Sequence, residues 1–169
     1  MLVRDRLWAP WRRDYHAGPR PRGCIFCAAW RTRDDRAQHV VYRARHVFAL
    51  LNHYPYNAGH LMIATRRHVG SLTSLSEQEA QELMAVTRRM VRRLAGLLSP
   101  QGFNVGLNLG RAGGAGIPKH LHMHVVPRWV GDTNFMPVLG GTRVISESLD
   151  ALYARLIQAN PVRDVSDVQ

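Results

Sequence analysis

The sequence predicts an α+β domain built on an antiparallel β-sheet. Strand-like segments come first, followed by a long helical segment, two more strands and a last helix. This order lacks the strand–helix–strand alternation that produces parallel sheets. The chain has 169 residues, 46% of them hydrophobic, which is enough for one domain with a substantial core.

Residues 1–36 are expected to form an N-terminal extension ahead of the sheet. Residues 7–11, Leu-Trp-Ala-Pro-Trp, are too aromatic for a disordered tail, and we expect them to pack across the domain or a subunit boundary. The only cysteines, Cys24 and Cys27, follow a glycine- and proline-rich loop, whereas a thioredoxin-type pair needs a helix starting at the first cysteine. Half of a zinc site is the preferred interpretation, and a metal-free remnant is the alternative.

The first strands are expected at residues 40–42, 47–51 and 60–64. A short polar turn joins the first two, as in a hairpin. The segment 52–59, Asn-His-Tyr-Pro-Tyr-Asn-Ala-Gly, has the residue types of a turn. Its position between two apolar strands makes it a candidate for ligand contacts, although a plain connector would look similar.

The clearest helix is predicted from Glu77 to Leu98, with a capping box formed by Ser76 and Glu79. Acidic residues come early and four arginines come late, which complements the helix dipole. We expect these arginines to be a solvated helix end rather than a nucleic-acid patch. One stripe at helical periodicity is expected to face the core: Ala80, Leu83, Met84, Thr87, Met90, Val91, Leu94 and Leu98.

A strand and a glycine-rich loop follow the helix. Residues 103–109 alternate in polarity, and four apolar side chains are expected to point inward: Phe103, Val105, Leu107 and Leu109. The loop 110–116 has backbone N–H groups that could approach a phosphate. A last helix is expected from about Glu147 to Gln158, capped by Ser146 and followed by a polar tail.

Three histidines occupy alternate positions in residues 120–126, His-Leu-His-Met-His-Val-Val. In a strand their imidazoles would share one face, whereas on a helix they would be about 200° apart. Pro127 after the run and the glycine-rich loop before it favour a strand. Its intervening residues Leu121, Met123 and Val125 would then face the core. Since imidazoles attack, shuttle protons and bind metals near neutral pH, this face is a candidate site; a merely polar surface strand is the alternative.

A neutral imidazole can attack phosphorus and divide one displacement into two steps. A neighbouring imidazole can protonate the leaving group, while backbone N–H groups and asparagine amides stabilise the phosphate oxygens. The competing use of these histidines is a catalytic metal site with a bound water. The sequence offers no obvious carboxylate for such a metal site, because no acidic residue lies between Glu82 and Asp132.

The net charge of +11 favours phosphate-bearing partners. Lys119 is the only lysine, and near-exclusive use of arginine is also typical of genome composition, so charge alone leaves small phosphorylated molecules and nucleic acid open. No apolar run is long enough to cross a bilayer, and the first residues lack a secretory signal. We therefore expect a cytoplasmic protein.

Residues 120–126 resemble the defining motif of the histidine triad (HIT) superfamily of nucleotide hydrolases and transferases. The resemblance runs from about Arg6 to Leu156, and further matching segments follow the family's order: Leu50 to Asn52, Gly59 to Ile63, Arg66 to His68, Gly106 to Asn108, and Pro127 with Arg128. Residues 7–12 and 129–135 resemble a bacterial branch that includes diadenosine tetraphosphate phosphorylases. The resemblance implies a HIT-like fold with one HIT domain over 1–169: a catalytic core at 37–135 and a C-terminal helix and tail at 136–169.

The resemblance also implies roles for individual residues. His122 would attack the α-phosphorus and carry the nucleotidyl intermediate, and His124 would donate to the bridging or leaving-group oxygen. His60 matches a supporting histidine beneath the triad. Asn52 matches a position that binds the ribose, and Asn108 matches one near the α-phosphate.

Zinc-containing relatives imply a structural site formed by Cys24, Cys27, His68 and His120. Such a Cys2His2 site would join the N-terminal loop to the catalytic strand and leave no position for a water molecule. His53 is the weaker candidate for the fourth ligand. A solvated surface histidine is the alternative interpretation of His68.

The chain departs from the family just before the triad. Many relatives have Gly-Gln-Ser where residues 115–119 here are Ala-Gly-Ile-Pro-Lys. Backbone amides of this loop, including those of Gly114 and Gly116, are expected to replace those phosphate contacts, with Lys119 adding charge. Pro118 has no N–H to donate.

These features predict a homodimeric enzyme that cleaves dinucleoside polyphosphates, such as diadenosine tetraphosphate, through a His122–AMP intermediate. Inorganic phosphate is the favoured acceptor, and water is the second. Hydrolysis of nucleoside phosphoramidates is another enzymatic alternative. A zinc-stabilised nucleotide- or RNA-binding module is the non-enzymatic alternative; intact His122 and the lack of aromatics interleaved with basic residues on one strand argue against it.

Overall fold

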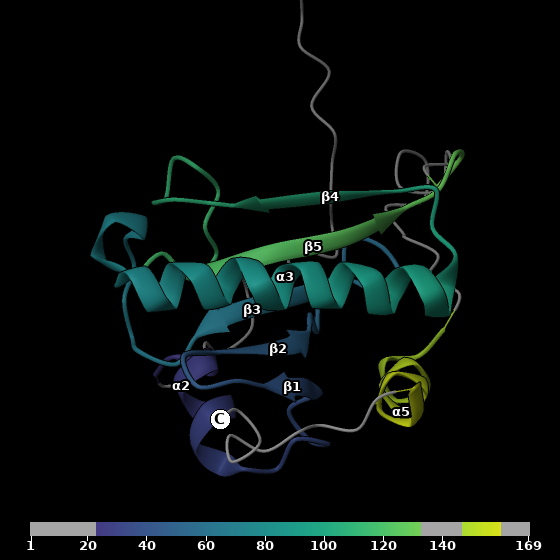
Figure 1. Cartoon of the computed structure of the whole chain (residues 1–169), viewed down its shortest axis with the longest axis horizontal. Coiled ribbons are helices and arrows are strands. Elements are labelled where there is room, and N and C mark those ends of the chain that lie inside the picture. Colours follow the sequence, from purple (N-terminus) through teal and green to yellow (C-terminus); the bar gives the residue numbers. More distant parts are fainter. Residues whose placement is uncertain (1–22, 133–146, 160–169) are drawn as a thin grey trace, which may run out of the picture.

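The computed structural model describes residues 23–132 and 147–159, and these ranges contain one five-stranded sheet. Its strands are β1 (Val40–Arg43), β2 (Val47–Leu51), β3 (Leu61–Thr65), β4 (Gly102–Leu107) and β5 (His122–Arg128). They lie in the order β1-β2-β3-β5-β4, and every neighbouring pair is antiparallel (Figure 1). The predicted α+β class with an antiparallel sheet is confirmed.

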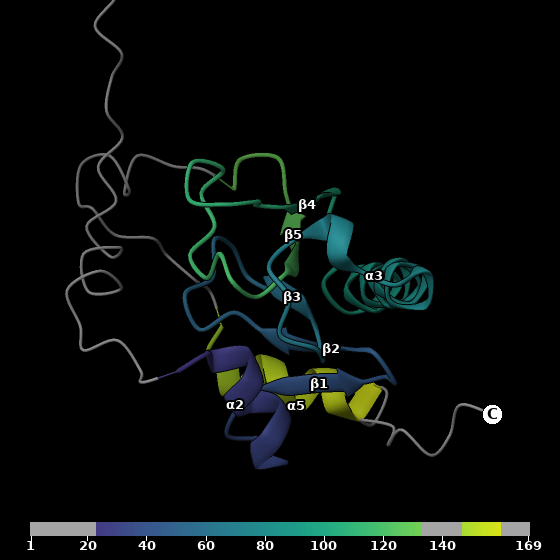
Figure 2. The same cartoon turned by 90° about the vertical axis from the view of Figure 1, so that its left-hand side faces the viewer.

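Helices cover both faces of this sheet. They are α2 (Ile25–Thr32), α3 (Glu77–Leu98) and α5 (Leu149–Ala159), with a short 3-10 helix η1 (Leu72–Ser74) before α3. Figure 2 shows α3 on one side of the sheet, and α2 with the loop between β4 and β5 on the other. Within the described ranges, no helix has both the length and the apolar character that crossing a membrane requires.

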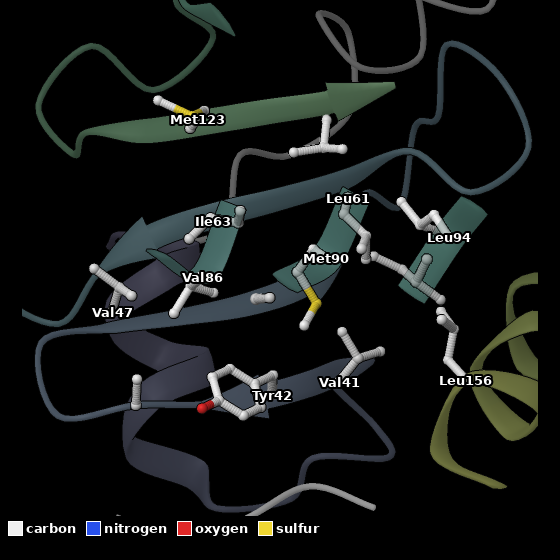
Figure 3. Close-up of a cluster of buried hydrophobic side chains, with 14 of the residues drawn as sticks. Val41, Tyr42, Val47, Leu61, Ile63, Val86, Met90, Leu94, Met123 and Leu156 are labelled. Carbon is white, nitrogen blue, oxygen red and sulfur yellow. The ribbon is translucent and has the colours of Figure 1, made fainter. Parts of the chain in front are cut away.

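The two faces carry separate apolar clusters. Figure 3 shows the larger one, between the sheet, α3 and α5, with Ile63, Met90 and Leu156 among its side chains. The second cluster lies on the α2 face and includes Phe26 and Phe48. Since both faces are covered, β2 and β3 are buried at every position, which explains why their sequences show no polar alternation.

The start of α3 matches the prediction. Ser76 is the N-cap, its hydroxyl accepts from the backbone N–H of Glu79, and the Glu79 carboxylate accepts from the backbone N–H of Ser76 at 2.8 Å. The same carboxylate accepts two bonds from Arg67, at 2.9 and 2.7 Å. These contacts, with the Arg67 bond as the largest cause, lower the pKa of Glu79 to about 2.

The predicted stripe on α3 was wrong at two positions. Ala80 and Met84 are exposed, and Val86 is buried in their place. The expected solvated arginine end is found at Arg88 and Arg92, which are exposed, but not at Arg89, which lies over the Tyr42 ring at 4.7 Å. Nearby, Arg93 donates to the backbone carbonyls of Val41 and Leu156. These arginines bind the end of α3 to β1 and α5.

Strand β4 forms one edge of the sheet. Phe103 and Leu107 pack against the core as predicted, but Val105 and Leu109 are not buried, since they are 46% and 45% exposed. The alternation predicts which side chains share a face of the strand, but not whether another element covers that face.

Pro127 does not end the histidine strand as predicted. It pairs with Phe103 on β4, beyond the last β3–β5 pair, where a missing N–H is tolerated.

Two helices differ from the prediction. Helix α2 was not predicted, yet it begins directly after Cys24. The last helix begins at Leu149 rather than Glu147, and the Ser148 hydroxyl accepts from the backbone N–H of Ala151 at 3.2 Å, so Ser148 takes the capping role. The expected Ser146 cap, the aromatic segment 7–11, residues 133–135 and the polar tail beyond 159 lie outside the described residues.

We expect Glu79→Gln to lower stability at neutral pH by about 1–2 kcal/mol, the scale of losing a capping box with a partly exposed ion pair. The pKa of Glu79 is about 2 in the folded chain against an ordinary 4.5. Because it is depressed, the ionised carboxylate stabilises the fold above pH 4.5, and this contribution disappears as the pH falls toward 2. Denaturant unfolding between pH 3 and 7 measures the difference, and Glu77→Gln is the control without a capping bond. A gap between Glu79→Gln and unaltered protein that stays constant down to pH 3 would contradict this account.

Candidate active site and metal centre

The second and third histidines of the motif lie on β5 and face the α2 side of the sheet. His122 pairs with Ala64 and His124 with Met62 on β3, and both β3 residues belong to the α2-side cluster. Of the intervening side chains, Met123 and Val125 belong to the cluster on the other side, as predicted, and Leu121, just before β5, is buried as well. The expected alternation is confirmed.

The three triad rings form a row. His120 lies two residues before the start of β5, and the Phe26 ring of α2 contacts both His120 and His122, at centroid distances of 5.1 and 4.8 Å. The His122 and His124 rings are 4.9 Å apart. Phe26 therefore covers part of the row, which the sequence analysis did not anticipate.

The hydrogen bonds of His122 define its tautomer. Its Nδ1 lies 2.8 Å from the backbone carbonyl of His120, which can only accept, so Nδ1 carries the proton and donates. The lone pair is then on Nε2. His122 is only 6% exposed, and its burial lowers its pKa more than the carbonyl bond raises it. A neutral imidazole with a nucleophilic Nε2 follows.

A second chain of contacts defines the tautomer of His124. The Tyr56 backbone N–H donates to His60 Nδ1 at 3.0 Å, and the Asn52 side-chain amide lies 3.3 Å from the same nitrogen. Since Nδ1 accepts, His60 carries its proton on Nε2 and donates to His124 Nδ1 at 2.9 Å. His124 in turn carries its own proton on Nε2. A proton donor thus lies beside the nucleophile.

The two predicted asparagines border this row from neighbouring strands. Asn52 directly follows β2 and contacts His60. Asn108 directly follows β4, one residue past Leu107, which pairs with Met123. If that register continues, Asn108 lies across from His122.

The glycine-rich loop has a backbone that needs glycine. Gly110 and Gly114 have φ of 68° and 85°, and a Cβ on Gly113 would lie 2.3 Å from the Leu109 carbonyl oxygen. The Gly114 N–H donates to the Arg111 carbonyl at 3.0 Å within the turn. The predicted use of this N–H for phosphate therefore requires the turn to open.

Four predicted ligands meet at the other end of the row. One donor atom each from Cys24, Cys27, His68 and His120 lies within 4.8 Å of the others. The Nδ1 of His120 is 3.2 Å from the Cys24 sulfur and 3.2 Å from His68 Nδ1, while the Cys27 sulfur is 3.3 Å from His68 Nδ1. His53 lies elsewhere, with its ring against His39.

This donor set fits a soft divalent metal ion. His120 Nε2 donates to the Thr65 carbonyl at 2.7 Å, which directs the Nδ1 lone pair toward the sulfurs. Burial, and then the neighbouring Cys24, raise the pKa of the Cys27 thiol, so a bound cation would favour its ionisation to the thiolate. The argument that no helix starts at Cys24 was wrong, and the case against a redox pair now rests on the two histidines.

Comparisons with known proteins agree with this geometry. A family model for the HIT domain matches residues 33–130. The AP-4-A phosphorylase of Mycobacterium tuberculosis H37Rv is 43% identical over 153 residues, which cover 86% of this chain and 78% of that protein. An uncharacterized HIT-like protein of Methanocaldococcus jannaschii is 30% identical over 64% of this chain and 81% of its own length.

A solved structure gives the same result for the fold. The crystal structure of a Zn-bound histidine triad family protein from Mycobacterium smegmatis superposes with a TM-score of 0.63 at 26% sequence identity. The match covers 80% of this chain and 94% of that one.

Proposed function

This chain belongs to the HIT domain family, and on that basis we propose that it is a nucleotidyl transferase that cleaves dinucleoside polyphosphates such as diadenosine tetraphosphate. The observation that carries the proposal is the bond from His122 Nδ1 to the His120 carbonyl, which leaves Nε2 as a nucleophile. The similarity to an AP-4-A phosphorylase supports the substrate class.

In the first step, His122 Nε2 attacks the α-phosphorus. The new N–P bond forms as the bond to the bridging oxygen breaks, and His124 Nε2–H donates a hydrogen bond to the departing oxygen, which stabilises the negative charge that develops there. The product is a nucleotidyl-His122 intermediate. Its imidazole ring is positively charged, and the His120 carbonyl stabilises that charge through the Nδ1–H bond at 2.8 Å.

In the second step, an acceptor attacks the same phosphorus, loses its proton to the solvent and releases neutral His122. Inorganic phosphate is the favoured acceptor, because the similar enzyme is a phosphorylase, and it would yield ADP plus ATP from diadenosine tetraphosphate. Water is the alternative and would yield AMP plus ATP. Hydrolysis of nucleoside phosphoramidates would use the same intermediate. The paired tautomers of His122 and His124 disfavour a binding module without turnover.

Four further residues are proposed to bind the nucleotide. Asn52 would bind the ribose, and Asn108 the oxygens of the α-phosphate. Gly116 and, once its turn opens, Gly114 would offer backbone N–H groups to the phosphates. The +11 net charge supports the recruitment of such an anionic substrate.

We propose zinc as the metal of the cluster formed by Cys24, Cys27, His68 and His120. Two thiolates and two imidazoles form a closed tetrahedral zinc site, and the similar histidine triad structure is Zn-bound. The metal would be structural, since four protein ligands leave no position for a reacting water. Thiolate ligands require a reducing compartment, which supports a cytoplasmic location that cell fractionation can check.

We further propose a homodimer joined through the edge of β4. This strand is the outermost in the sheet, and apolar side chains are exposed along it and the neighbouring face of α3: Met84, Val105 and Leu109. The division into residues 1–36, 37–135 and 136–169 stays a prediction, which the family match over residues 33–130 supports.

Diadenosine tetraphosphate incubated with the protein and inorganic phosphate is expected to give ADP plus ATP, separated by ion-exchange chromatography. Omitting phosphate should remove ADP, and AMP in its place would identify water as the acceptor. His122→Ala should lower turnover by at least about 10³-fold, because it removes the nucleophile. His46→Ala, on the turn between β1 and β2, is the histidine control and should keep full activity.

Two outcomes would contradict the proposal. Turnover by His122→Ala within tenfold of the unaltered protein would rule out the nucleophile. Failure of protein quenched with detergent at alkaline pH, where a histidine N–P bond is stable, to carry a nucleotidyl group on His122 during turnover would rule out the covalent route.

Cys24→Ser is expected to lose most of the zinc, about one ion per chain in the unaltered protein, and to melt about 5–10 °C lower. The reason is that three ligands bind zinc more weakly than four and no longer hold α2 firmly to His120. Elemental analysis and thermal unfolding measure the two effects. His53→Ala removes the alternative ligand and should retain zinc, so zinc loss in this control, or unchanged zinc in Cys24→Ser, would overturn the assignment.

Val105→Glu is expected to convert the dimer to a monomer, because a buried charge at the β4 edge would lack a partner. Light scattering after size-exclusion chromatography measures the mass. Leu72→Glu is a control of similar exposure on η1, 43% against 46%, and should remain dimeric. A monomeric unaltered protein at micromolar concentration would refute the dimer.

A further inference from the structure

The loop between β2 and β3 is attached to the end of β5 by one side chain. The amide nitrogen of Asn57 donates to a carboxylate oxygen of Asp132 at 2.8 Å and lies 3.1 Å from the Pro127 backbone carbonyl. Asn57 is separated from both partners by at least 70 residues in sequence. The contact therefore fixes the loop relative to the strand that carries His124.

Asp132 is itself firmly held. Its side chain is only 8% exposed, and its carboxylate accepts from Arg128 Nε at 2.6 Å and from a second Arg128 nitrogen at 2.9 Å. The backbone N–H of Trp129 donates to it at 3.1 Å. With the Asn57 bond, four N–H groups converge on one carboxylate, which makes it a rigid anchor.

The same part of the loop has a second, independent contact with β5. Gly59 has a φ of 78°, and a Cβ there would lie 3.0 Å from the Pro127 ring and 2.6 Å from the Leu98 side chain. The loop backbone thus packs directly on Pro127. In addition, the Asn57 carbonyl accepts from the His60 backbone N–H at 3.2 Å, which closes a turn between the anchor and His60.

The anchor lies next to the donor that determines the tautomers. Tyr56 immediately precedes Asn57, and its backbone N–H donates to His60 Nδ1 at 3.0 Å. The Tyr56 ring also lies against the rings of His60 and His124, at centroid distances of 4.6 and 5.9 Å. A shift of residues 56 and 57 would weaken this bond and leave the longer 3.3 Å contact from Asn52 to hold the His60 tautomer.

We propose that Asn57 is a positioning residue for proton donation to the leaving group. Anchored by Asp132, it holds the Tyr56 N–H on His60 Nδ1, so that His60 donates to His124 and His124 keeps its proton on Nε2. Without the anchor, His60 can take the other tautomer and accept from His124, which places the His124 proton on the nitrogen that faces away from the substrate. The inference rests on the proposed function, because it requires a substrate at His122.

The test compares two AMP esters that differ in the need for a proton. The p-nitrophenyl ester has a stabilised leaving phenolate that departs unaided, whereas the phenyl ester releases a phenolate about as basic as that of tyrosine, with a pKa of about 10. Asn57→Ala is expected to lower kcat/KM for the phenyl ester by about 10- to 100-fold, part of what a general acid contributes, and for the p-nitrophenyl ester by less than about threefold.

Two variants control this comparison. Asn104→Ala removes the acceptor of a 2.5 Å bond from Arg128 in the same network, but does not touch the loop, so the ratio of the two esters should not change. His124→Ala should itself show the selective loss. Adding Asn57→Ala to His124→Ala should then have no further effect on the ratio, since both changes act through one group.

The outcomes separate this inference from the proposed function. If the unaltered protein cleaves neither ester nor diadenosine tetraphosphate, the proposed function fails. If it cleaves both esters, but Asn57→Ala lowers both equally or lowers the ratio further in the His124→Ala background, only the positioning role is overturned. Retained p-nitrophenyl ester cleavage shows that the variant is folded.

Discussion

The pairing of β3 with β5 is the constraint on which both ends of the site depend. Its register sets Ala64 opposite His122 and Met62 opposite His124. Thr65, the last residue of β3, then presents its carbonyl to His120. His60, just before the first residue of β3, forms a hydrogen bond with His124. A slip by one residue would turn every histidine of β5 to the opposite face of the sheet and separate all of these contacts.

Main-chain groups decide the protonation of each ring in the row. The carbonyls of Thr65 and His120 accept from His120 and His122, and the Tyr56 N–H donates to His60. Such groups cannot change their own protonation. Thr65 lies in β3, and His120 is next to Leu121, whose carbonyl accepts from the Thr65 backbone N–H at 3.3 Å, so both carbonyls are held close to the sheet. The exception is the Tyr56 N–H, which lies in a loop and therefore needs a tether of its own, and Asn57 supplies it.

The sequence was informative where a local pattern has one physical solution. The capping box at Ser76, the alternation around His122 and the clustering of Cys24, Cys27, His68 and His120 were all predictable from residue type and spacing, or from the family resemblance. Periodicity failed for Met84 and Val105, because it identifies a face but not whether a neighbouring element covers it. Asn57 could not be found, since its partner Asp132 is 75 residues away and its effect passes through a backbone N–H.

Helix α2 connects the proposed metal centre to His122, the proposed nucleophile. At its start, Cys24 and Cys27 belong to the metal cluster, and near its end the Arg43 guanidinium donates to the Ala29 carbonyl at 2.9 Å. Between these two attachments the fully buried Phe26 lies on the rings of both His120 and His122. A metal bound at the cluster would therefore act on the chemistry only through packing: it would hold Phe26 against the ring of His122 and limit the access of water to the ring that is proposed to attack phosphorus. This explains how four ligands with no open position can matter to a reaction that none of them performs.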